Sequence, residues 1–107
     1  MSLQLLWAII RPEKKAKVLR RLEAEGFNAV TETPVQGRGK QRGIQVGAAI
    51  YEELAKTMLV LAVDDERSQQ AIQAIQEEAH TGHMGDGKIF VQPVDQVLTI
   101  RTGKSEL

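Results

Sequence analysis

The sequence predicts an α+β domain: a ferredoxin-like sandwich with the order β-α-β-β-α-β, one four-stranded sheet and a short additional C-terminal strand. Two apolar runs, at residues 5–10 and 58–63, are short and rich in bulky side chains, which is typical of buried strands. Each run is followed by a segment with a helical apolar stripe. The 107 residues suit one domain, and we expect a single domain over residues 1–107.

The first half of the chain predicts a strand, a helix and a second strand. The first strand, at residues 5–10, ends before Pro12, which suits the first position of a helix. Gly26 ends this helix. The second strand is expected at residues 27–36, where Pro34 indicates an edge position. The apolar stripe of the helix consists of Val18, Leu19 and Leu22.

The second half repeats this order after a long loop. The third strand, at residues 58–63, is followed at 64–66 by three acids that suit the N-cap and first turn of a helix. Two short strands are expected at residues 88–92 and 98–101, with one helical turn between them at 93–97. The apolar face of the second helix consists of Ala71, Ile72, Ile75 and Ala79.

The two central strands predict an oligomer. The runs at residues 5–10 and 58–63 are apolar at odd and even positions alike, so both faces of each strand should be buried. Two helices can cover only one face of the sheet. We therefore expect the open face to pack against further copies of the same chain.

Composition excludes several classes of function. The chain has no cysteine, which excludes disulfides, thiolate catalysis and zinc or iron–sulfur sites with cysteine ligands. Fourteen basic and fourteen acidic residues give no net charge, which argues against a nucleic-acid-binding protein. We find no apolar segment long enough to span a membrane and no secretory signal, so we expect a cytoplasmic protein.

Two glycine-rich segments indicate an anion site. Residues 37–43 interleave three glycines with three cations, and residues 82–88 lie between a helix and a strand. In the second segment Gly82 suits the C-cap of the helix, which leaves residues 85–88 as a tight turn that brings Lys88 beside backbone donors. Each segment alone is equally typical of a solvated loop or plain turn. Together, at strand ends of one small domain, they favour a phosphate site.

The sequence of residues 81–91 closely resembles the B-loop signature of the PII nitrogen-regulatory signal proteins. Residues 101–103 resemble the end of their C-loop, residues 8–12 their opening strand, and residues 37–43 the entry to their T-loop. The resemblance covers essentially the whole chain. It implies a ferredoxin-like trimer, either of this chain alone or with a related PII-like chain. Such trimers bind ATP or ADP between subunits, sense 2-oxoglutarate and control partners through the T-loop.

The resemblance also implies roles for individual residues, with a T-loop at about residues 37–56, a B-loop at about 81–88 and a C-loop at about 98–103. Gln41 would help to coordinate Mg²⁺ together with ATP and effector, and Lys56 would pair with an effector carboxylate. The partner-docking loop would include Arg42, Val46 and Tyr51. The implied nucleotide-binding residues are Gly37, Gly39, Lys40, Gln41, Gly85, Asp86, Gly87, Lys88 and Arg101.

Two departures from the family pattern leave details open. Thr99 stands where the main branch has a further arginine, so the preference between ATP and ADP is open. The loop at residues 42–56 is short, so Tyr51 is not equated with the tyrosine that some members modify. The short loop is most similar to the nitrogenase-associated branch.

We therefore expect a regulator rather than an enzyme, because no nucleophile is paired with a base. Its partner would be nitrogenase, or another nitrogen-assimilation enzyme or transporter. The alternatives are a PII-like nucleotide sensor with a different effector and partner, a weak ATPase in which Asp86 would be the base, and a purely structural oligomerising domain.

Overall fold

The computed structural model describes residues 2–40 and 51–107. The elements, in chain order, are β1 (Leu3–Ile10), a 3₁₀ turn (Pro12–Lys14), α1 (Lys15–Ala24), β2 (Thr31–Lys40), β3 (Tyr51–Asp64), α2 (Asp65–Ala79) and β4 (Gly87–Val94).

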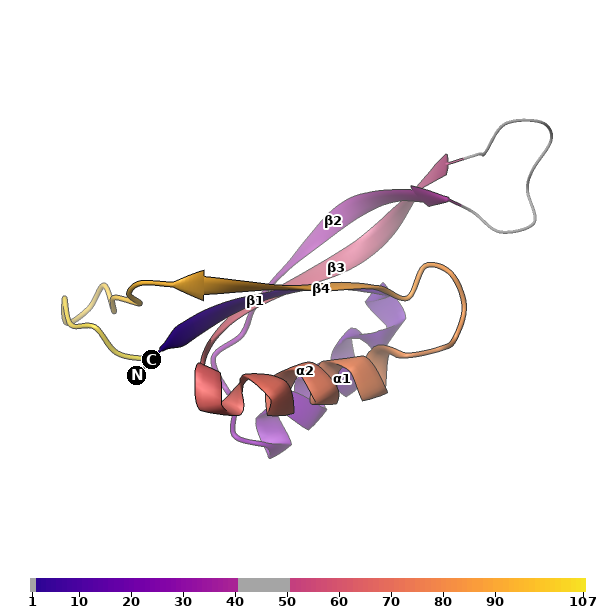
Figure 1. Cartoon of the computed structure of the whole chain (residues 1–107). Coiled ribbons are helices and arrows are strands. Elements are labelled where there is room, and N and C mark those ends of the chain that lie inside the picture. The colour runs from indigo at the N-terminus through magenta and orange to yellow at the C-terminus, as the bar shows by residue number, and fades with distance from the viewer. Residues whose placement is uncertain (1, 41–50) are drawn as a thin grey trace.

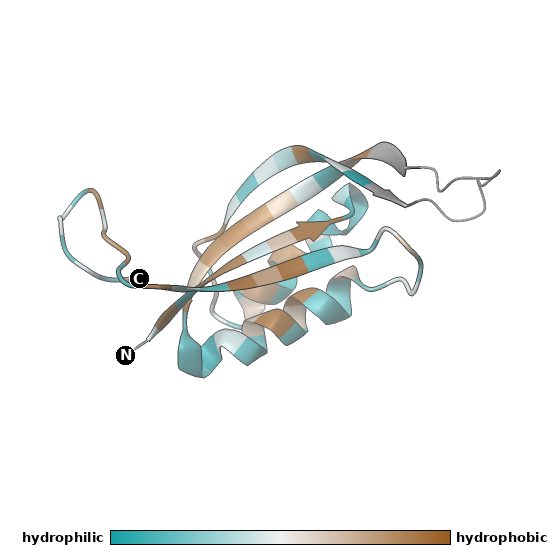
Figure 2. Cartoon of the chain, turned by 45° about the horizontal axis from the view of Figure 1, so that its top comes forward, coloured by the Kyte–Doolittle hydropathy of each residue, from teal (hydrophilic) through white to brown (hydrophobic). Residues whose placement is uncertain are grey.

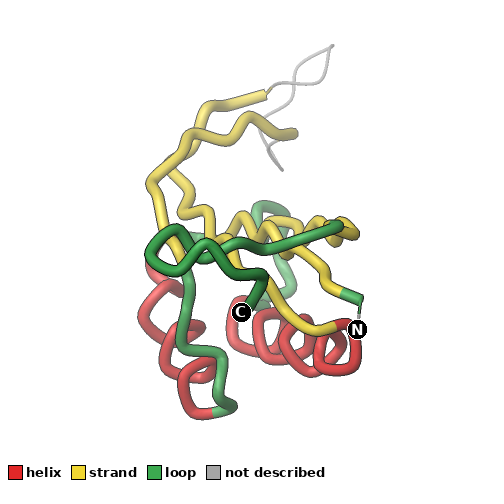
Figure 3. Tube along the Cα trace, turned by 90° about the vertical axis from the view of Figure 1, so that its left-hand side faces the viewer, coloured by secondary structure: helices red, strands yellow, loops and turns green. Residues whose placement is uncertain are grey.

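The four strands form one antiparallel sheet in the order β2-β3-β1-β4. Both helices lie on the same face of this sheet, side by side (Figures 1 and 3). The expected α+β sandwich is therefore confirmed. Pro34 lies on β2, an edge strand, where a missing backbone donor is tolerated.

The helix ends follow the local signals in the sequence. Asp64 caps α2, because its side chain accepts a hydrogen bond from the Glu66 N–H. At the end of α1, Gly26 has a φ of +91°, and the Phe27 N–H donates to the Leu22 carbonyl over 2.8 Å. This C-terminal capping motif places Phe27 in the core and explains why β2 begins only at Thr31, four residues later than expected.

The core lies between the sheet and the two helices. Alternate residues of β1 and β3 face the helices and are buried. The predicted apolar faces of both helices meet them there, with Leu19 and Ile72 partly buried at the margin. The largest fully buried side chains are Leu6, Ile10, Leu22, Leu59, Ile75, Val18 and Val63.

The opposite face of the sheet carries no helix (Figure 2), and the residues of β1 and β3 that point to it are mostly apolar. Trp7 of β1 faces Val60 on β3 and Phe90 on β4, so these three side chains form a row across the open face. Phe90 is 53% exposed. The central strands are thus apolar at odd and even positions because one set of side chains packs against the helices and the other set points to the face of the sheet that is open in the single chain.

The strands are longer than the sequence pattern indicated. The ends of the expected T-loop belong to β2 and β3, where residues 37–40 pair with residues 51–54, and residues 55 and 56 pair with Gln36 and Val35. The expected helical turn at residues 93–97 is wrong, because Pro93 and Val94 belong to β4. Since β4 is an edge strand, the proline can be accommodated there.

The expected strand at residues 98–101 is also wrong. Leu98 forms a single bridge with Ser105, and the Thr99 N–H donates to the Lys104 carbonyl over 2.9 Å. The chain reverses between them, where Gly103 has a φ of +72°. This segment is therefore a small local turn at the end of the chain. Among the residues that the structure describes, no helix has the length and apolarity needed to cross a membrane.

Candidate functional site

A cleft of about 480 Å³ lies between the paired ends of β2 and β3 and the segment that joins α2 to β4. Three cations, Arg38, Lys56 and Lys88, line it beside glycine backbone, so it suits an anion. Six of the residues predicted from the sequence meet in this cleft: Gly37, Lys56, Gly85, Asp86, Gly87 and Lys88.

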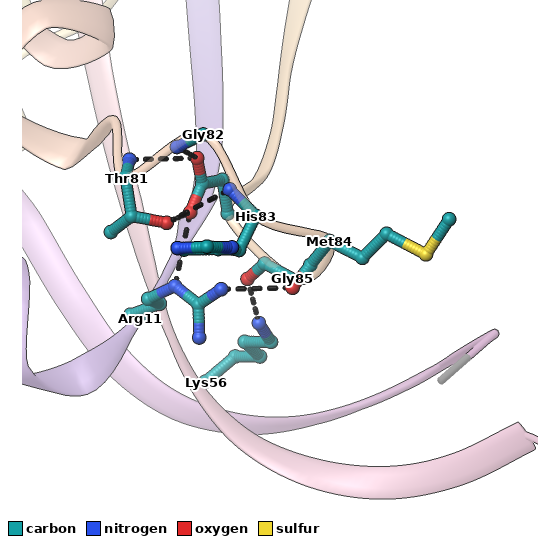
Figure 4. A network of polar contacts seen from close by, with 8 residues as sticks. Arg11, Lys56, Thr81, Gly82, His83, Met84 and Gly85 are labelled. Carbon is teal, nitrogen blue, oxygen red and sulfur yellow. Dashed lines mark hydrogen bonds and ion pairs between the residues drawn. The ribbon is translucent and has the colours of Figure 1, made fainter. Parts of the chain in front are cut away.

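Sheet register brings the loop before β4 to the end of β1. Ile10, the last residue of β1, is paired with Gly87, the first residue of β4. Arg11, which follows β1, therefore lies beside Asp86, which precedes β4. The Arg11 Nε donates to the Asp86 Oδ1 over 3.0 Å, and the Arg11 Nη2 donates to the Met84 carbonyl over 2.8 Å (Figure 4). The arginine therefore ties the loop to the strand that precedes α1.

The Asp86 carboxylate organises the loop from within. Its Oδ2 accepts hydrogen bonds from the backbone N–H groups of Thr81 and Gly82, over 2.8 and 2.9 Å, and its Oδ1 accepts from the Thr81 hydroxyl. Partial burial opposes ionisation of Asp86, but these hydrogen bonds and Arg11 outweigh it and hold the pKa of its carboxyl well below the usual range. Asp86 is thus an ionised structural anchor, and a poor proton acceptor.

These contacts change the role of Gly82. The helix α2 ends at Ala79 and its C-cap is His80, so the expected C-cap at Gly82 is wrong. Gly82 instead has a φ of +89° and gives its N–H to Asp86. Its conformation serves the loop rather than the helix.

Lys56 enters the cleft from β3 and donates a hydrogen bond to the Gly85 carbonyl (Figure 4). It is only 8% exposed. Burial, followed by the charge of Arg11, lowers the pKa of the Lys56 ammonium. A buried cation that meets a neutral carbonyl and a second cation would gain from an anionic ligand.

The remaining predicted residues lie elsewhere. Gly39 and Lys40 are at the end of β2, and Lys40 is paired with Tyr51 at the start of β3. Gln41, Arg42 and Val46 lie outside the described residues.

Arg101 lies in the C-terminal segment, at the opposite end of the molecule from the loop before β4 (Figure 1). The eight residues of β4 separate the two segments. At a rise of roughly 3.3 Å per residue, that strand spans about 23 Å. Arg101 therefore cannot reach the cleft of its own chain.

Sequence reasoning missed Arg11 and Arg38. Arg38 lies between Gly37 and Gly39 in the cationic glycine-rich segment, and this position could have predicted that it lines the anion site. Arg11 gave no such signal, because its proximity to Asp86 depends on the pairing of β1 with β4.

A second cavity, of about 370 Å³, lies on the helical side of β4 and has walls from Ile72, Ile75 and Ala79. Lys88 borders both cavities, but Arg38 and Lys56 line only the first, which therefore gathers more positive charge than the second. Within residues 2–40 and 51–107, no three His, Asp or Glu side chains gather as they would around a metal ion.

The sequence is similar to known proteins over nearly its whole length. Residues 3–104 match the family model described as Nitrogen regulatory protein P-II. The chain is 50% identical to the nitrogen fixation nifHD1 region GlnB-like protein 1 of Methanosarcina barkeri, over 98% of this chain and 100% of that protein. It is 45% identical to the nifHD region glnB-like protein 1 of Methanococcus maripaludis, over 94% and 95% of the two chains.

A solved structure is also similar. The crystal structure of Arabidopsis thaliana PII bound to citrate superposes with a TM-score of 0.80 and 31% identity, over 97% of this chain and 85% of that one.

Proposed function

The chain belongs to the nitrogen regulatory protein P-II family, and we propose that it senses ATP or ADP together with 2-oxoglutarate and controls a nitrogen-metabolism partner through the segment between β2 and β3. The observation that carries this proposal is the cationic cleft, in which two glycine-rich segments distant in sequence lie together. Polyphosphates are bound by backbone N–H groups and cations in such an arrangement.

The phosphates would contact the loop before β4 and the ammonium group of Lys88. Gly37, from the end of β2, lies close to the Lys56 side chain, so a β-carbon at this position would stand 3.2 Å from the Lys56 Cγ. The glycines leave room for a ligand beside the backbone. Gly39 and Lys40 continue β2, and in this proposal they would complete the nucleotide site from that side.

The site would be completed by a second copy of the chain. Arg101 is remote from the cleft of its own chain, and the open face of the sheet presents the row of Trp7, Val60 and Phe90. We propose a trimer in which these faces meet and Arg101 of one copy reaches the phosphates bound by another. Covering the open face supplies the hydrophobic gain for assembly.

The effector would share the cleft with the nucleotide. Lys56 is the buried cation that an effector carboxylate would neutralise. Mg²⁺ prefers six oxygens and is usually bound by a few protein ligands together with phosphate oxygens, so Gln41 would be its protein ligand beside ATP and 2-oxoglutarate. The citrate in the Arabidopsis thaliana PII structure favours one alternative, a sensor with a different carboxylate effector.

The partner is proposed from the relatives. The Methanosarcina barkeri and Methanococcus maripaludis proteins are named for the nitrogen fixation region, which supports nitrogenase as the partner. Arg42, Val46 and Tyr51 would form part of the docking segment. We propose a regulatory role in the cytoplasm, without catalysis of its own, because the Asp86 carboxylate that a weak ATPase would use as its base is engaged by Arg11 and Thr81.

Calorimetry tests the proposed function. ATP and ADP should bind to the purified chain, and 2-oxoglutarate should bind in the presence of Mg²⁺ and ATP. Titration with citrate under the same conditions separates the alternative effector from 2-oxoglutarate. A chain that binds neither ATP nor ADP would contradict the proposal. Turnover of ATP at a steady rate would favour the weak ATPase instead.

A further inference from the structure

Two cations hold the carbonyl groups of the loop before β4. Arg11 contacts the Met84 carbonyl and the Asp86 carboxylate through two different nitrogens, and Lys56 contacts the Gly85 carbonyl (Figure 4). The Arg11 and Asp86 side chains are 23% and 24% exposed. We refer to the contacts among Arg11, Thr81, Met84 and Asp86 as the arginine clasp.

The arginine clasp sets the orientation of one peptide group. Met84 and Gly85 form a turn, and the φ of +99° at Gly85 is the value found at the third residue of a type II turn. The related type I turn has the same central peptide rotated by roughly 180°. Because the Met84 carbonyl is bonded to Arg11, this rotation would break the contact. The clasp therefore selects one of two neighbouring turn conformations.

The orientation of the carbonyl also fixes the following N–H. All peptide bonds of the described residues are trans, so the Gly85 N–H points opposite to the Met84 carbonyl and away from Arg11. Of the described residues, Gly85 lines the cleft and Arg11 does not. Arg11 thus holds the loop from outside the cleft.

We propose that Arg11 is a positioning residue of the nucleotide site, which acts through the Met84–Gly85 peptide to present the Gly85 N–H to a phosphate oxygen. The ligand class is a nucleoside di- or triphosphate. Asp86 and Thr81 take part as anchors that hold the arginine and the loop together. This inference rests on the proposed function of the cleft.

The arginine clasp and a simple effect of charge predict opposite results for Asp86. If side chains near the cleft acted only as charges, removing the negative charge of Asp86 would strengthen the binding of an anionic nucleotide. If Asp86 positions the loop, Asp86→Asn would weaken binding, because an amide cannot accept all the hydrogen bonds that both carboxylate oxygens accept. The sign of the change separates the two explanations.

The experiment measures the affinities of the purified chain for ATP and for adenosine, which lacks the phosphates. Arg11→Gln, Thr81→Val and Asp86→Asn should each weaken ATP binding by about tenfold, the effect of one lost charge-assisted or buried hydrogen bond, and leave adenosine binding unchanged. Lys15→Gln, which removes a nearby cation from α1, should bind ATP like the parent chain. The amide resonance of Gly85 should shift when ATP binds to the parent chain.

Further outcomes separate this inference from the proposed function. Arg11→Lys keeps the charge but not both contacts, so it should bind ATP more weakly than the parent, and it serves if Arg11→Gln does not fold. If the parent binds ATP and Asp86→Asn binds it equally or more tightly, the positioning role is wrong and the nucleotide site remains. If the parent binds no ATP, the proposed function fails, and the positioning role fails with it.

Discussion

The α-carbon of Gly87 lies against the backbone carbonyl of Ile9. A β-carbon at residue 87 would overlap the Ile9 oxygen, and the φ of Gly87, +107°, is one that residues with side chains rarely adopt. The two residues lie where β4 begins to pair with β1, directly after the Asp86 anchor. The start of the strand and the shape of the loop therefore both depend on the missing side chain.

Gly87→Ala should destabilise the protein by about 3 kcal/mol, since it combines backbone strain with overlap against a carbonyl that cannot move freely. Gly103→Ala is the matched control, because its φ is also positive but its β-carbon would meet nothing within 4 Å. That change should cost about 1 kcal/mol, the strain alone. Urea unfolding of both variants measures the difference. Equal losses would mean that the overlap with Ile9 has no energetic effect.

Stability should fall in acid because of Asp86. Its pKa is lowered in the folded protein, so its contribution is complete above the ordinary pKa of an aspartate, about 4, and is lost as the pH falls below that value. Asp86→Asn should therefore flatten the decline of unfolding free energy below about pH 4. Asp95→Asn, at an exposed position after β4, controls for the change in net charge. A decline as steep in Asp86→Asn as in the parent would contradict the assignment.

Local signals predicted most of the elements. The strand that begins the chain, the helix after Asp64 and the end of α1 at Gly26 all depend on residues adjacent in sequence, and the structure confirms them. The errors occurred where the local pattern was ambiguous. A helical turn was expected at residues 93–97, but the edge strand β4 accommodates Pro93, and the segment after Leu98 folds on itself.

The site was predictable only in part. The glycines and Lys88 carried a recognisable pattern, but Arg11 meets Asp86 through the register of β1 with β4. Register depends on which faces of the strands are buried together, and this is a property of the whole sheet. The role of Asp86 as an anchor of its own loop also depended on the positions of the Thr81 and Gly82 backbone, which no sequence pattern specifies.

The open face of the sheet should make the chain a trimer of about 36 kDa, three times the chain mass of 11.9 kDa. Val60→Glu places a charge in the middle of the row formed with Trp7 and Phe90, and it should give monomers or unfolded chains, because an unpaired charge is costly at a buried interface. Arg20→Glu, exposed on α1, should leave the mass unchanged. Light scattering measures the mass. A parent chain that is a stable monomer at micromolar concentration would exclude the trimer.

Two single variants should each lose nucleotide binding and recover it when mixed. Lys88→Ala and Arg101→Ala each remove a charge-assisted contact to phosphate, so each should weaken ATP binding by about ten- to a hundredfold. After joint unfolding and refolding of equal amounts, about one site in three of each mixed trimer, and so about a quarter of all sites, should carry both side chains and bind ATP tightly. Calorimetry gives this fraction directly. No recovery would mean that Arg101 does not act between copies.

The last prediction is that 2-oxoglutarate binds together with MgATP and depends on Lys56. Lys56 is nearly buried beside Arg11, and its pKa is lowered by burial and by that neighbour, although Glu13 and Asp86 act in the opposite direction, so an effector carboxylate would add counter-charge beside its ammonium group. Lys56→Met keeps most of the side-chain volume and should lower the affinity for 2-oxoglutarate at least tenfold, with a smaller effect on ATP. Lys15→Met, on α1, should bind both ligands like the parent.

Gln41→Ala should abolish 2-oxoglutarate binding even in the presence of Mg²⁺ and ATP, since the resemblance makes Gln41 the protein ligand of the metal. Calorimetry with ATP, with MgATP and with MgADP distinguishes these cases, and only MgATP should support 2-oxoglutarate binding. Because Gln41 and Lys56 flank the docking segment, the effector should change the affinity for the partner, and linkage requires the partner to change the affinity for the effector by the same factor. Tight binding of 2-oxoglutarate to the nucleotide-free chain would contradict this mechanism and leave the fold and the nucleotide cleft unaffected.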